Sequence, residues 1–484
     1  MRYDVAIVGG GVVGCAIARE LSQYHLDVLL LEAEAEVGFG TSKANSGIIH
    51  AGAHAKPTTS MGPLEWAGNR RWGPLVEELG IGFRRVGELV VAVEPEQVAT
   101  LEELLAQGRA KGVPGLELWE PERIRRAEPN LSDDIVAALW APTAGVINPY
   151  EATLLLAESA ARNGVAVRTG REVLGLECDA EATWTVKTAA EAYATRFVVN
   201  AAGLRSDWIA DLAGVGDFTI TPRKGEEYLL DKRVAGLVSR IIFPCPTPTT
   251  KGILVIPTVD GTIMVGPTAE DVDAKDDTST SQHGVDKVFR SVQRLVPGIS
   301  RKDVIASFAG LRAEPSTGDF VIGPTARAGF INAAGMKSPG LTSAPAVAAR
   351  IADALADQGL RLSLRDDFEP SLPRRARFST MTLHERISLA SADPAFARLV
   401  CRCEHVTEAE VTDAIRRGSH TIDGVKFRTR AGMGRCQGGF CTWRVMELLA
   451  RQLGIPITEV TKRGGDSWIA RPREDPSVGE EVAP

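Results

Sequence analysis

A glycine motif near the N-terminus is the feature that most restricts the fold of this 484-residue chain. An apolar segment, residues 3–8, leads into Gly9-x-Gly11-x-x-Gly14, and a helical pattern follows directly. The first glycine permits a tight turn, the second lets the backbone approach a pyrophosphate, and the third lets helix and strand pack closely. The N-terminus of the helix would offer N–H groups to the phosphates. The arrangement predicts a dinucleotide site.

A second apolar segment, residues 28–31, ends at Glu32, which follows Gly14 by 18 residues. An acid at this position of a dinucleotide site hydrogen-bonds a ribose diol and would repel a 2′-phosphate. A glycine turn that only packs a helix against a strand is the alternative interpretation. Because strand, turn, helix, second strand and terminal acid occur in this order, the sequence favours a bound dinucleotide.

Composition narrows the partners that this chain can have. It holds 55 basic and 62 acidic residues, a net charge of −7, which argues against a nucleic-acid or anionic-membrane partner. The uncharged run over residues 5–18 is rich in glycine and shorter than the ~20 residues that span a bilayer. We therefore expect a cytoplasmic protein without a signal peptide or direct membrane insertion, with any link to a membrane running through a partner subunit.

The order of apolar segments predicts the fold class. Strand-like and helix-like segments alternate at the N-terminus and again around residues 320–358, whereas the middle of the chain is rich in strand-like segments. This pattern predicts an α/β fold in which a Rossmann-type domain is interleaved with a β-rich substrate domain, followed by a small helical C-terminal domain. We expect strands near residues 83–93, 196–203, 228–230, 253–265, 320–322 and 330–334, and helices over 96–111 and 343–358.

Four of the seven cysteines crowd into the last fifth of the chain. They form the pattern Cys401-x-Cys403 and, after a segment that reads as helix, loop and helix, Cys436-x4-Cys441. Zinc sites usually carry pairs spaced by two to four residues, whereas four thiolates also suit a [2Fe–2S] cluster. The C-x-C spacing favours the cluster, and structural zinc or free thiols are the alternatives.

The sequence between the two cysteine pairs and after the second pair predicts helices. Thr407 and Glu410 form a capping box at one helix start, and Gly418 ends that helix. An apolar stripe follows Cys441, which places the second cysteine pair at the start of another helix, where a thiolate is favoured. Four basic residues of this segment would offset the charge of a cluster: Lys426, Arg428, Arg430 and Arg435.

Several stretches carry a family resemblance: residues 38–52 (GFGTSKANSGIIHAG), 200–203, 310–312 and 335–340 (GMKSPG). In this order they resemble the glycine/D-amino-acid-oxidase superfamily of flavoproteins over nearly all of residues 1–365. The resemblance implies FAD as the cofactor. Besides the first motif, it implies Thr41 and Ser42 near the pyrophosphate, the segment from Ser46 and Gly47 to His50 beside the flavin ring, and Val173 near the adenine. It also implies contacts from the two later turns, by Ala202, Gly203, Gly335, Gly340, Leu341 and Thr342.

The C-terminal segment, including residues 432–441 (GMGRCQGGFC), resembles the bacterioferritin-associated-ferredoxin-like [2Fe–2S] domain. Two redox centres in one chain imply a route: a substrate gives a hydride to FAD, and the cluster passes the electrons on singly. We therefore expect a dehydrogenase rather than an oxidase. Its electron acceptor would be a quinone, a ferredoxin or a partner subunit, the last making a hetero-oligomer.

These observations predict a domain arrangement. The FAD-binding domain takes residues 1–80, 148–215 and 319–365, and the substrate domain takes residues 81–147 and 216–318. A linker over 366–397, the [2Fe–2S] domain over 398–455 and a C-terminal tail over 456–484 complete the chain.

Four residues are candidates for the substrate side: Arg312, Lys337, His50 and His54. Arg312 can hold a carboxylate or phosphate through two hydrogen bonds, or can form an ordinary surface ion pair. Lys337 lies in the late glycine turn, where its charge would stabilise a reduced flavin or an anionic substrate. Either histidine can act as a general base, although a lone histidine is more often structural. Lysines are usually solvated, so two others are weaker candidates: Lys56 and Lys251.

The combination of the two domains resembles the anaerobic glycerol-3-phosphate dehydrogenase large-subunit family. This resemblance implies oxidation of sn-glycerol 3-phosphate to dihydroxyacetone phosphate. Where that family has an arginine after its HxG segment, residues 50–57 read HAGAHAKP, a form closer to L-2-hydroxyglutarate-oxidising enzymes. Both readings imply hydride removal from a small anionic secondary alcohol. The alternatives are an amino or imino acid substrate and a non-catalytic electron-transfer subunit. An NAD-dependent reductase is disfavoured, because no second G-x-G-x-x-G joins a strand to a helix.

Overall fold

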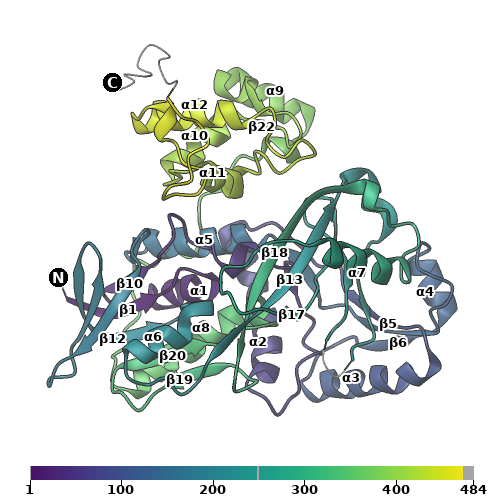
Figure 1. Ribbon diagram of the computed structural model, residues 1–484, viewed down its shortest axis with the longest axis horizontal. Coiled ribbons are helices and arrows are strands. Elements are labelled where there is room, and N and C mark those ends of the chain that lie inside the picture. Colours follow the sequence, from purple (N-terminus) through teal and green to yellow (C-terminus); the bar gives the residue numbers. More distant parts are fainter. Residues whose placement is uncertain (1, 248–249, 473–484) are drawn as a thin grey trace, which may run out of the picture. The chain divides into compact units, whose positions relative to one another are not determined.

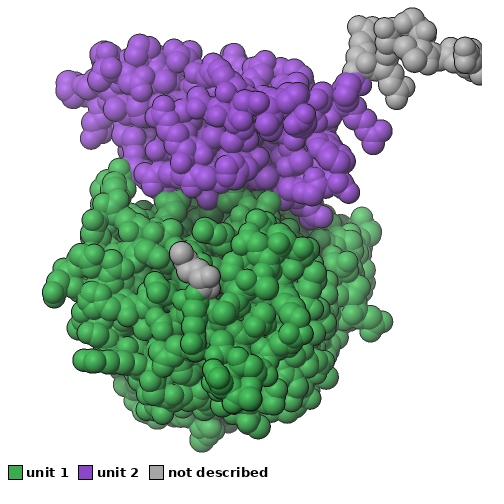
Figure 2. All heavy atoms as spheres, turned by 90° about the vertical axis from the view of Figure 1, so that its left-hand side faces the viewer, with its two compact units in different colours: residues 1–374 green, residues 375–484 purple. Residues whose placement is uncertain are grey.

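The computed structural model describes residues 2–247 and 250–472. The chain divides into two compact units that meet in sequence at Arg374 and Arg375, and Figure 2 colours them separately. Within the described ranges, no helix is long and apolar enough to cross a membrane.

A mixed sheet of eight strands contains the N-terminal strand (Figure 1). β1 (Arg2–Val8) pairs in parallel with β2 (Val28–Leu31) and with β12 (Ala192–Asn200). The other strands are β9 (Ala166–Arg168), β10 (Val173–Cys178), β11 (Trp184–Thr188), β19 (Val321–Pro324) and β20 (Phe330–Ala334). Three segments that are far apart in the sequence therefore build one sheet.

Four helices of this part of the first unit pack against one another. α1 (Val12–Leu21) packs against α5 (Pro149–Arg162) and α8 (Gly340–Asp357), and α2 (Met61–Leu79) packs on α8. Nearly every residue of α1 is buried, which accounts for its continuous run of small and apolar side chains.

A second sheet of nine strands holds most of the remaining core of this unit. Along β5 (Glu88–Ala92), Leu89 and Val91 enter one apolar cluster, and Val90 and Ala92 enter another, so the sheet is covered on both faces. Its other strands are β6 (Glu117–Trp119), β7 (Ala137–Ala141), β13 (Ile220–Leu230), β14 (Ile241–Pro244), β15 (Leu254–Pro257), β16 (Ile263–Gly266), β17 (Glu270–Asp271) and β18 (Val304–Pro315).

The longest pairing of this sheet is the antiparallel one between β13 and β18 (Figure 1). It sets Gly225 opposite Gly310 and Arg223 opposite Arg312. A smaller sheet joins β3 (Ile48–Ile49), β8 (Gly145–Ile147) and β4 (Phe83–Arg84). The helices that accompany the strands of the nine-stranded sheet are α3 (Val98–Ala110), α4 (Pro121–Ala127) and α7 (Gln282–Gln293), whereas α6 (Ser206–Leu212) packs on the first sheet, against β10, β12 and β20.

The second unit is small and mainly helical. A short hairpin, β21 (Leu399–Cys401) and β22 (Val406–Thr407), precedes its three central helices. These are α10 (Glu408–Arg416), α11 (Ile422–Thr429) and α12 (Thr442–Leu453), and α9 (Leu383–Ala392) precedes the hairpin. The capping box predicted at Thr407 and Glu410 opens α10, as expected.

The structure confirms the predicted fold class, an α/β part interleaved with a β-rich part and followed by a small helical unit. Two predicted strands are each divided by a glycine with positive φ. Gly87 (φ 71°) separates β4 from β5 within residues 83–93, and Gly261 (φ 80°) turns residues 253–265 into a hairpin. Val460, in the predicted tail, packs into the core of the second unit. The last part of that tail, residues 473–484, lies outside the described residues.

Candidate active site and cluster site

The predicted dinucleotide turn has the close contacts that its glycines imply. A Cβ at Gly14 would lie 1.9 Å from the Gly9 carbonyl oxygen, and a Cβ at Gly9, where φ is 107°, would lie 2.4 Å from the Ala201 carbonyl oxygen. Glu32 Oε2 accepts a hydrogen bond from Gly10 N at 2.7 Å, so the acid reaches the turn. Burial raises the pKa of Glu32.

The segment over residues 41–47 lies against this turn. Ser42 Oγ accepts from Val12 N at 2.8 Å at the start of α1, and Thr41 Oγ1 donates to the Leu311 carbonyl oxygen at 2.6 Å. Ser46 Oγ donates to Glu227 Oε1 at 2.5 Å. The two residues predicted near the pyrophosphate, Ser42 and Thr41, are therefore bonded to α1 and β18. Ser46, predicted beside the flavin ring, is bonded to β13.

Other predicted cofactor residues lie where strands end. Val173 opens β10 and is buried, and Ala202 and Gly203 form the turn after β12. A Cβ at Gly40 or Gly203 would meet no atom within 4 Å, so there is open space beside both turns. These turns are packed against a strand and a helix on one side and have open space on the other. Such an arrangement fits a dinucleotide such as FAD.

The late glycine turn is joined to the segment that carries the two candidate histidines. It runs from Gly335, where φ is 66°, to Gly340 at the start of α8. Thr342 Oγ1 accepts from His50 N at 2.9 Å, and the Leu341 carbonyl oxygen accepts from Trp72 Nε1 at 3.1 Å. The side chains of Ser338 and His50 also meet, with Ser338 Oγ 3.4 Å from His50 Nε2.

Two buried side chains of α2 and one lysine fix the backbone of residues 50–55. Asn69 Nδ2 donates to the His50 carbonyl oxygen at 2.7 Å, and Glu65 Oε2 accepts from Ala55 N at 3.1 Å. Lys111 Nζ donates to the same Glu65 oxygen at 3.1 Å and also to the Ala55 carbonyl oxygen. Both histidines are therefore presented by a firmly held segment.

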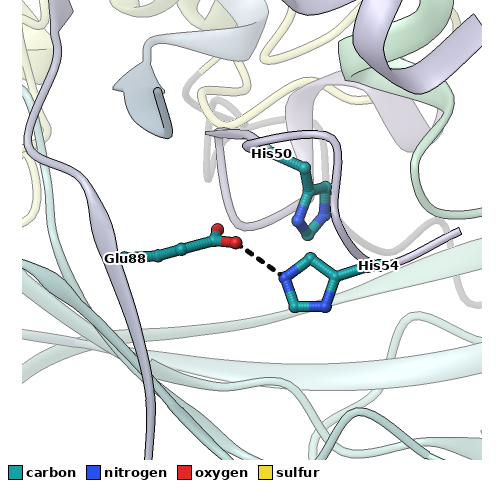
Figure 3. Close-up of side chains that lie close together, drawn as sticks. All are labelled: His50, His54 and Glu88. Carbon is teal, nitrogen blue, oxygen red and sulfur yellow. Dashed lines mark hydrogen bonds and ion pairs between the residues drawn. The ribbon is translucent and has the colours of Figure 1, made fainter. Parts of the chain in front are cut away.

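His54 is paired with a carboxylate that begins a buried strand. Its Nε2 lies 2.9 Å from Glu88 Oε1, and both side chains are almost fully buried (Figure 3). The His50 ring lies edge-on to the His54 ring, with centroids 5.2 Å apart, and Phe243 packs against both rings. One ligand atom from each of His50, His54 and Glu88 lies within 4.8 Å of the others.

His50 is a neutral imidazole at physiological pH. Burial lowers the pKa of His50 well below its usual range, and the positive charge of Lys251 lowers it further. Its Nδ1 has no hydrogen-bond partner among the described residues. A buried, neutral imidazole with an unused nitrogen is suited to accept a proton.

Two basic residues lie near this group: Lys251, predicted as a weaker candidate, acts on His50 by its charge, and Arg312, predicted as a candidate, lies close to Lys251. Lys251 Nζ donates to Ser338 Oγ at 3.4 Å, and Arg312 Nη2 donates to the Thr268 carbonyl oxygen at 3.2 Å. Burial lowers the pKa of Lys251, and Arg312 adds to this effect by charge repulsion. Lys337 is ion-paired with Glu314, and Lys56 is exposed.

Glu227 is a buried carboxyl group on the same face of the β13–β18 pairing as Arg312. Burial raises the pKa of Glu227 to about 7, against the opposing effects of the Ser46 hydrogen bond and of the Arg312 charge. Its Oε2 has no hydrogen-bond partner among the described residues.

Three residues of this site were not predicted from the sequence. Glu88, Glu227 and Ser338 carry polar atoms that meet the candidate residues only in the folded chain. The sequence does carry one signal for Glu88, because a charged residue begins the otherwise apolar segment ELVVA. In the structure this glutamate is buried.

The second unit gathers all four C-terminal cysteines. Cys403 Sγ lies 3.6 Å from Cys436 Sγ, and the Cys441 thiol donates a hydrogen bond that lowers the pKa of Cys401 to about 6. Cys441 is the N-cap of α12, as predicted, and a Cβ at Gly434 would lie 2.3 Å from Cys403 Cβ. Four free thiols at the ends of two loops fit an iron–sulfur cluster held by four cysteines. One of the four basic residues predicted nearby, Arg430, pairs with Glu404 at 3.0 Å.

Two protein families match this chain. The FAD dependent oxidoreductase family matches residues 4–354, and the BFD-like [2Fe-2S] binding domain matches residues 399–451. The four cysteines all lie within the second match. FAD and a [2Fe–2S] cluster are therefore the cofactors, and the zinc and free-thiol alternatives are set aside.

Individual proteins are similar over most of the chain. A glycerol 3-phosphate dehydrogenase of Caloramator mitchellensis is 44% identical over 470 residues, 96% of this chain and 98% of the relative. The structure of an FAD-bound L-α-glycerophosphate oxidase from Mycoplasma pneumoniae has a TM-score of 0.74 and 31% identity, covering 78% of this chain and 100% of that chain. Human mitochondrial L-2-hydroxyglutarate dehydrogenase is 30% identical, covering 64% of this chain and 78% of the relative.

Proposed function

Since this chain belongs to the FAD-dependent oxidoreductase family, we propose that it is a dehydrogenase that oxidises sn-glycerol 3-phosphate to dihydroxyacetone phosphate. The observation that carries the proposal is the charge around His50. Lys251 and Arg312 are partly buried cations close enough to repel each other, and Lys251 shares Ser338 with His50. A cation beside a neutral base, with a second cation close to the first, matches a phosphate dianion attached next to a secondary alcohol.

The roles of the protein groups follow from this arrangement. Bound FAD supplies the hydride acceptor, and the turns at residues 9–14, 41–47 and 335–342 are the parts of the chain that would hold it. His50 accepts the proton of the substrate hydroxyl, because its low pKa leaves it neutral. Arg312 and Lys251 bind the phosphate and so fix the carbon that is oxidised. Lys337, already paired with Glu314, contributes less free charge to the substrate.

Dehydrogenase rather than oxidase activity is supported by the second unit. The Caloramator dehydrogenase aligns over 470 residues, long enough to include both family matches, whereas a glycerol 3-phosphate oxidase of Mycoplasma genitalium aligns over only 378. An alignment of that length cannot span residues 4–451. A [2Fe–2S] cluster carries single electrons, so we propose that they leave through it to a separate acceptor.

Anaerobic titration of the purified holoenzyme with sn-glycerol 3-phosphate tests the substrate. We expect bleaching of the flavin absorption band in the wild-type protein, and a requirement for at least tenfold more substrate in Arg312→Ala and Lys251→Met. Persistence of the oxidised flavin spectrum at millimolar substrate would contradict the proposal.

L-2-hydroxyglutarate is the second candidate substrate. The form HAGAHAKP over residues 50–57 favours it, because that segment resembles the corresponding part of L-2-hydroxyglutarate-oxidising enzymes. The same titration distinguishes the two: flavin bleaching by L-2-hydroxyglutarate, and not by glycerol 3-phosphate, would establish the 2-hydroxy acid as the substrate class.

A further inference from the structure

We propose that Glu88, held by His54, forms a subsite for the hydroxyl group next to the one that is oxidised, so that the enzyme selects a vicinal diol and disfavours a second carboxylate. The inference rests on the proposed function and names the group that separates its two candidate substrates. The turns proposed to hold FAD and the basic residues do not supply this selection.

The free oxygen of Glu88 is the first observation. Glu88 is 1% exposed, and its Oε1 is occupied by His54 Nε2 at 2.9 Å. Its Oε2 is buried and has no hydrogen-bond partner among the described residues. A buried carboxylate oxygen without a donor costs free energy, and a ligand hydroxyl would remove this cost.

The position of the Glu88 carboxylate is the second observation. A carboxylate oxygen of Glu88 and a nitrogen of His50 lie within 4.8 Å of each other, and His50 also contacts the late glycine turn through Ser338 and Thr342. When the reacting hydroxyl is at His50, a hydroxyl on the adjoining carbon is within reach of Glu88. sn-Glycerol 3-phosphate has a hydroxyl there, whereas 2-hydroxyglutarate has a carboxylate on one side and a methylene on the other.

The charge of the cluster is the third observation. Lys251 is attracted by both Glu65 and Glu88, and each of these acids has one buried oxygen without a hydrogen-bond partner among the described residues, but Glu65 is ion-paired with Lys111. Glu88 is bonded to the His54 ring instead of a lysine, so its negative charge is the less balanced of the two. A substrate carboxylate in this place would meet a like charge, which disfavours binding.

His54 acts here as a positioning residue. Its Nε2–H group fixes the Glu88 carboxylate, and its ring packs against Phe243 and His50. With Nε2 committed to Glu88, His54 is the less suitable of the two histidines to serve as the base, and His50 takes that role.

The test compares substrates within each enzyme variant. For wild type, Glu88→Leu and Glu88→Gln, kcat/KM is measured with sn-glycerol 3-phosphate and with 2-hydroxypropyl phosphate, which lacks the terminal hydroxyl. We expect wild type to prefer the diol by about 10- to 100-fold, and Glu88→Leu to lose most of this preference. Glu88→Gln should raise the activity with L-2-hydroxyglutarate relative to glycerol 3-phosphate, because the like charge is removed.

A matched control separates selection from loss of structure. Glu128 is also buried (2% exposed), but both of its oxygens are bonded, to Ser239 and Arg240. Glu128→Gln should keep the wild-type preference for the diol, whatever its effect on unfolding temperature. An unchanged preference in both Glu88 variants, with wild-type flavin still reduced by glycerol 3-phosphate, would overturn the subsite. Failure of wild type to be reduced by glycerol 3-phosphate would overturn the proposed function, and the subsite with it.

Discussion

The guanidinium group of Arg312 lies directly over Gly225 on the neighbouring strand. A Cβ at Gly225 would be 2.6 Å from Arg312 Nη2 and 2.8 Å from Pro267 Cβ. The backbone of Ala44 packs directly on Gly310, the residue paired with Gly225, since a Cβ at Gly310 would be 1.9 Å from the Ala44 carbonyl oxygen. Two opposed glycines therefore make room for the arginine and for the segment that leads to Ser46.

This relationship predicts the effect of a single methyl group. Gly225→Ala should displace the Arg312 guanidinium and lower kcat/KM for sn-glycerol 3-phosphate by about tenfold, or ~1.4 kcal/mol, mainly through KM. Gly73→Ala in α2 is the matched control, because a Cβ there meets no atom within 4 Å. Equal kinetic constants for Gly225→Ala and wild type would show that Arg312 does not bind the phosphate.

The low pKa of His50 predicts the pH dependence of substrate oxidation. A base acts only when it is unprotonated, so its loss of function on acidification should begin well below pH 6.5. His50→Gln should lower the rate of anaerobic flavin reduction by about 10²- to 10⁴-fold and remove the acid limb of the profile. Stopped-flow reduction from pH 5 to 9 measures both. An acid limb that persists in His50→Gln would assign the base to another residue.

Glu227 predicts a pH dependence of stability. Its folded pKa of about 7 lies above the value of the exposed group, so only the unfolded chain releases this proton between about pH 4.5 and 7. The contribution of Glu227 is present below that range and is lost as the pH rises through 7. The free energy of unfolding should fall by on the order of 2–3 kcal/mol across the range, and Glu227→Gln should remove this loss.

Urea unfolding of the holoenzyme at pH 5, 6, 7 and 8 measures the effect. Ser46→Ala provides a second check: its hydroxyl donates to Glu227 and lowers the pKa, so the loss should extend to higher pH in this variant. Parallel curves for wild type and Glu227→Gln would show that Glu227 titrates normally in the folded state.

The cysteine cluster predicts a separation of the two half-reactions. Cys436→Ser should abolish the iron–sulfur absorption but leave anaerobic bleaching of the flavin by substrate, because the proposed oxidation site lies in the other unit. Steady-state reduction of a one-electron acceptor should fall by at least tenfold. Cys178→Ser, which alters a free thiol of β10, is the control and should retain both spectra. Undiminished acceptor reduction in Cys436→Ser would exclude the proposed electron route.

The sequence by itself determined the two cofactor-binding parts. A Gly-x-Gly-x-x-Gly turn and four cysteines at a particular spacing are local patterns, because the backbone of one turn or the ends of two loops supply most of each site. The fold class followed from the order of apolar segments. The structure differs from this prediction at Gly87 and Gly261, where a predicted strand is divided into two. These features depend on neighbours in the chain, so periodicity and turn chemistry reveal them.

The tertiary structure decided which polar groups surround the substrate. Glu88 meets His54 across 34 positions, Glu227 meets Ser46 across 181, and Arg312 lies over Gly225 through strand pairing. No local sequence pattern predicts these contacts, because the two residues of each pair lie on different strands or segments. Burial then sets their chemistry: it keeps His50 neutral, raises the pKa of Glu227 and leaves one oxygen of Glu88 free, and burial is a property of the packed chain alone.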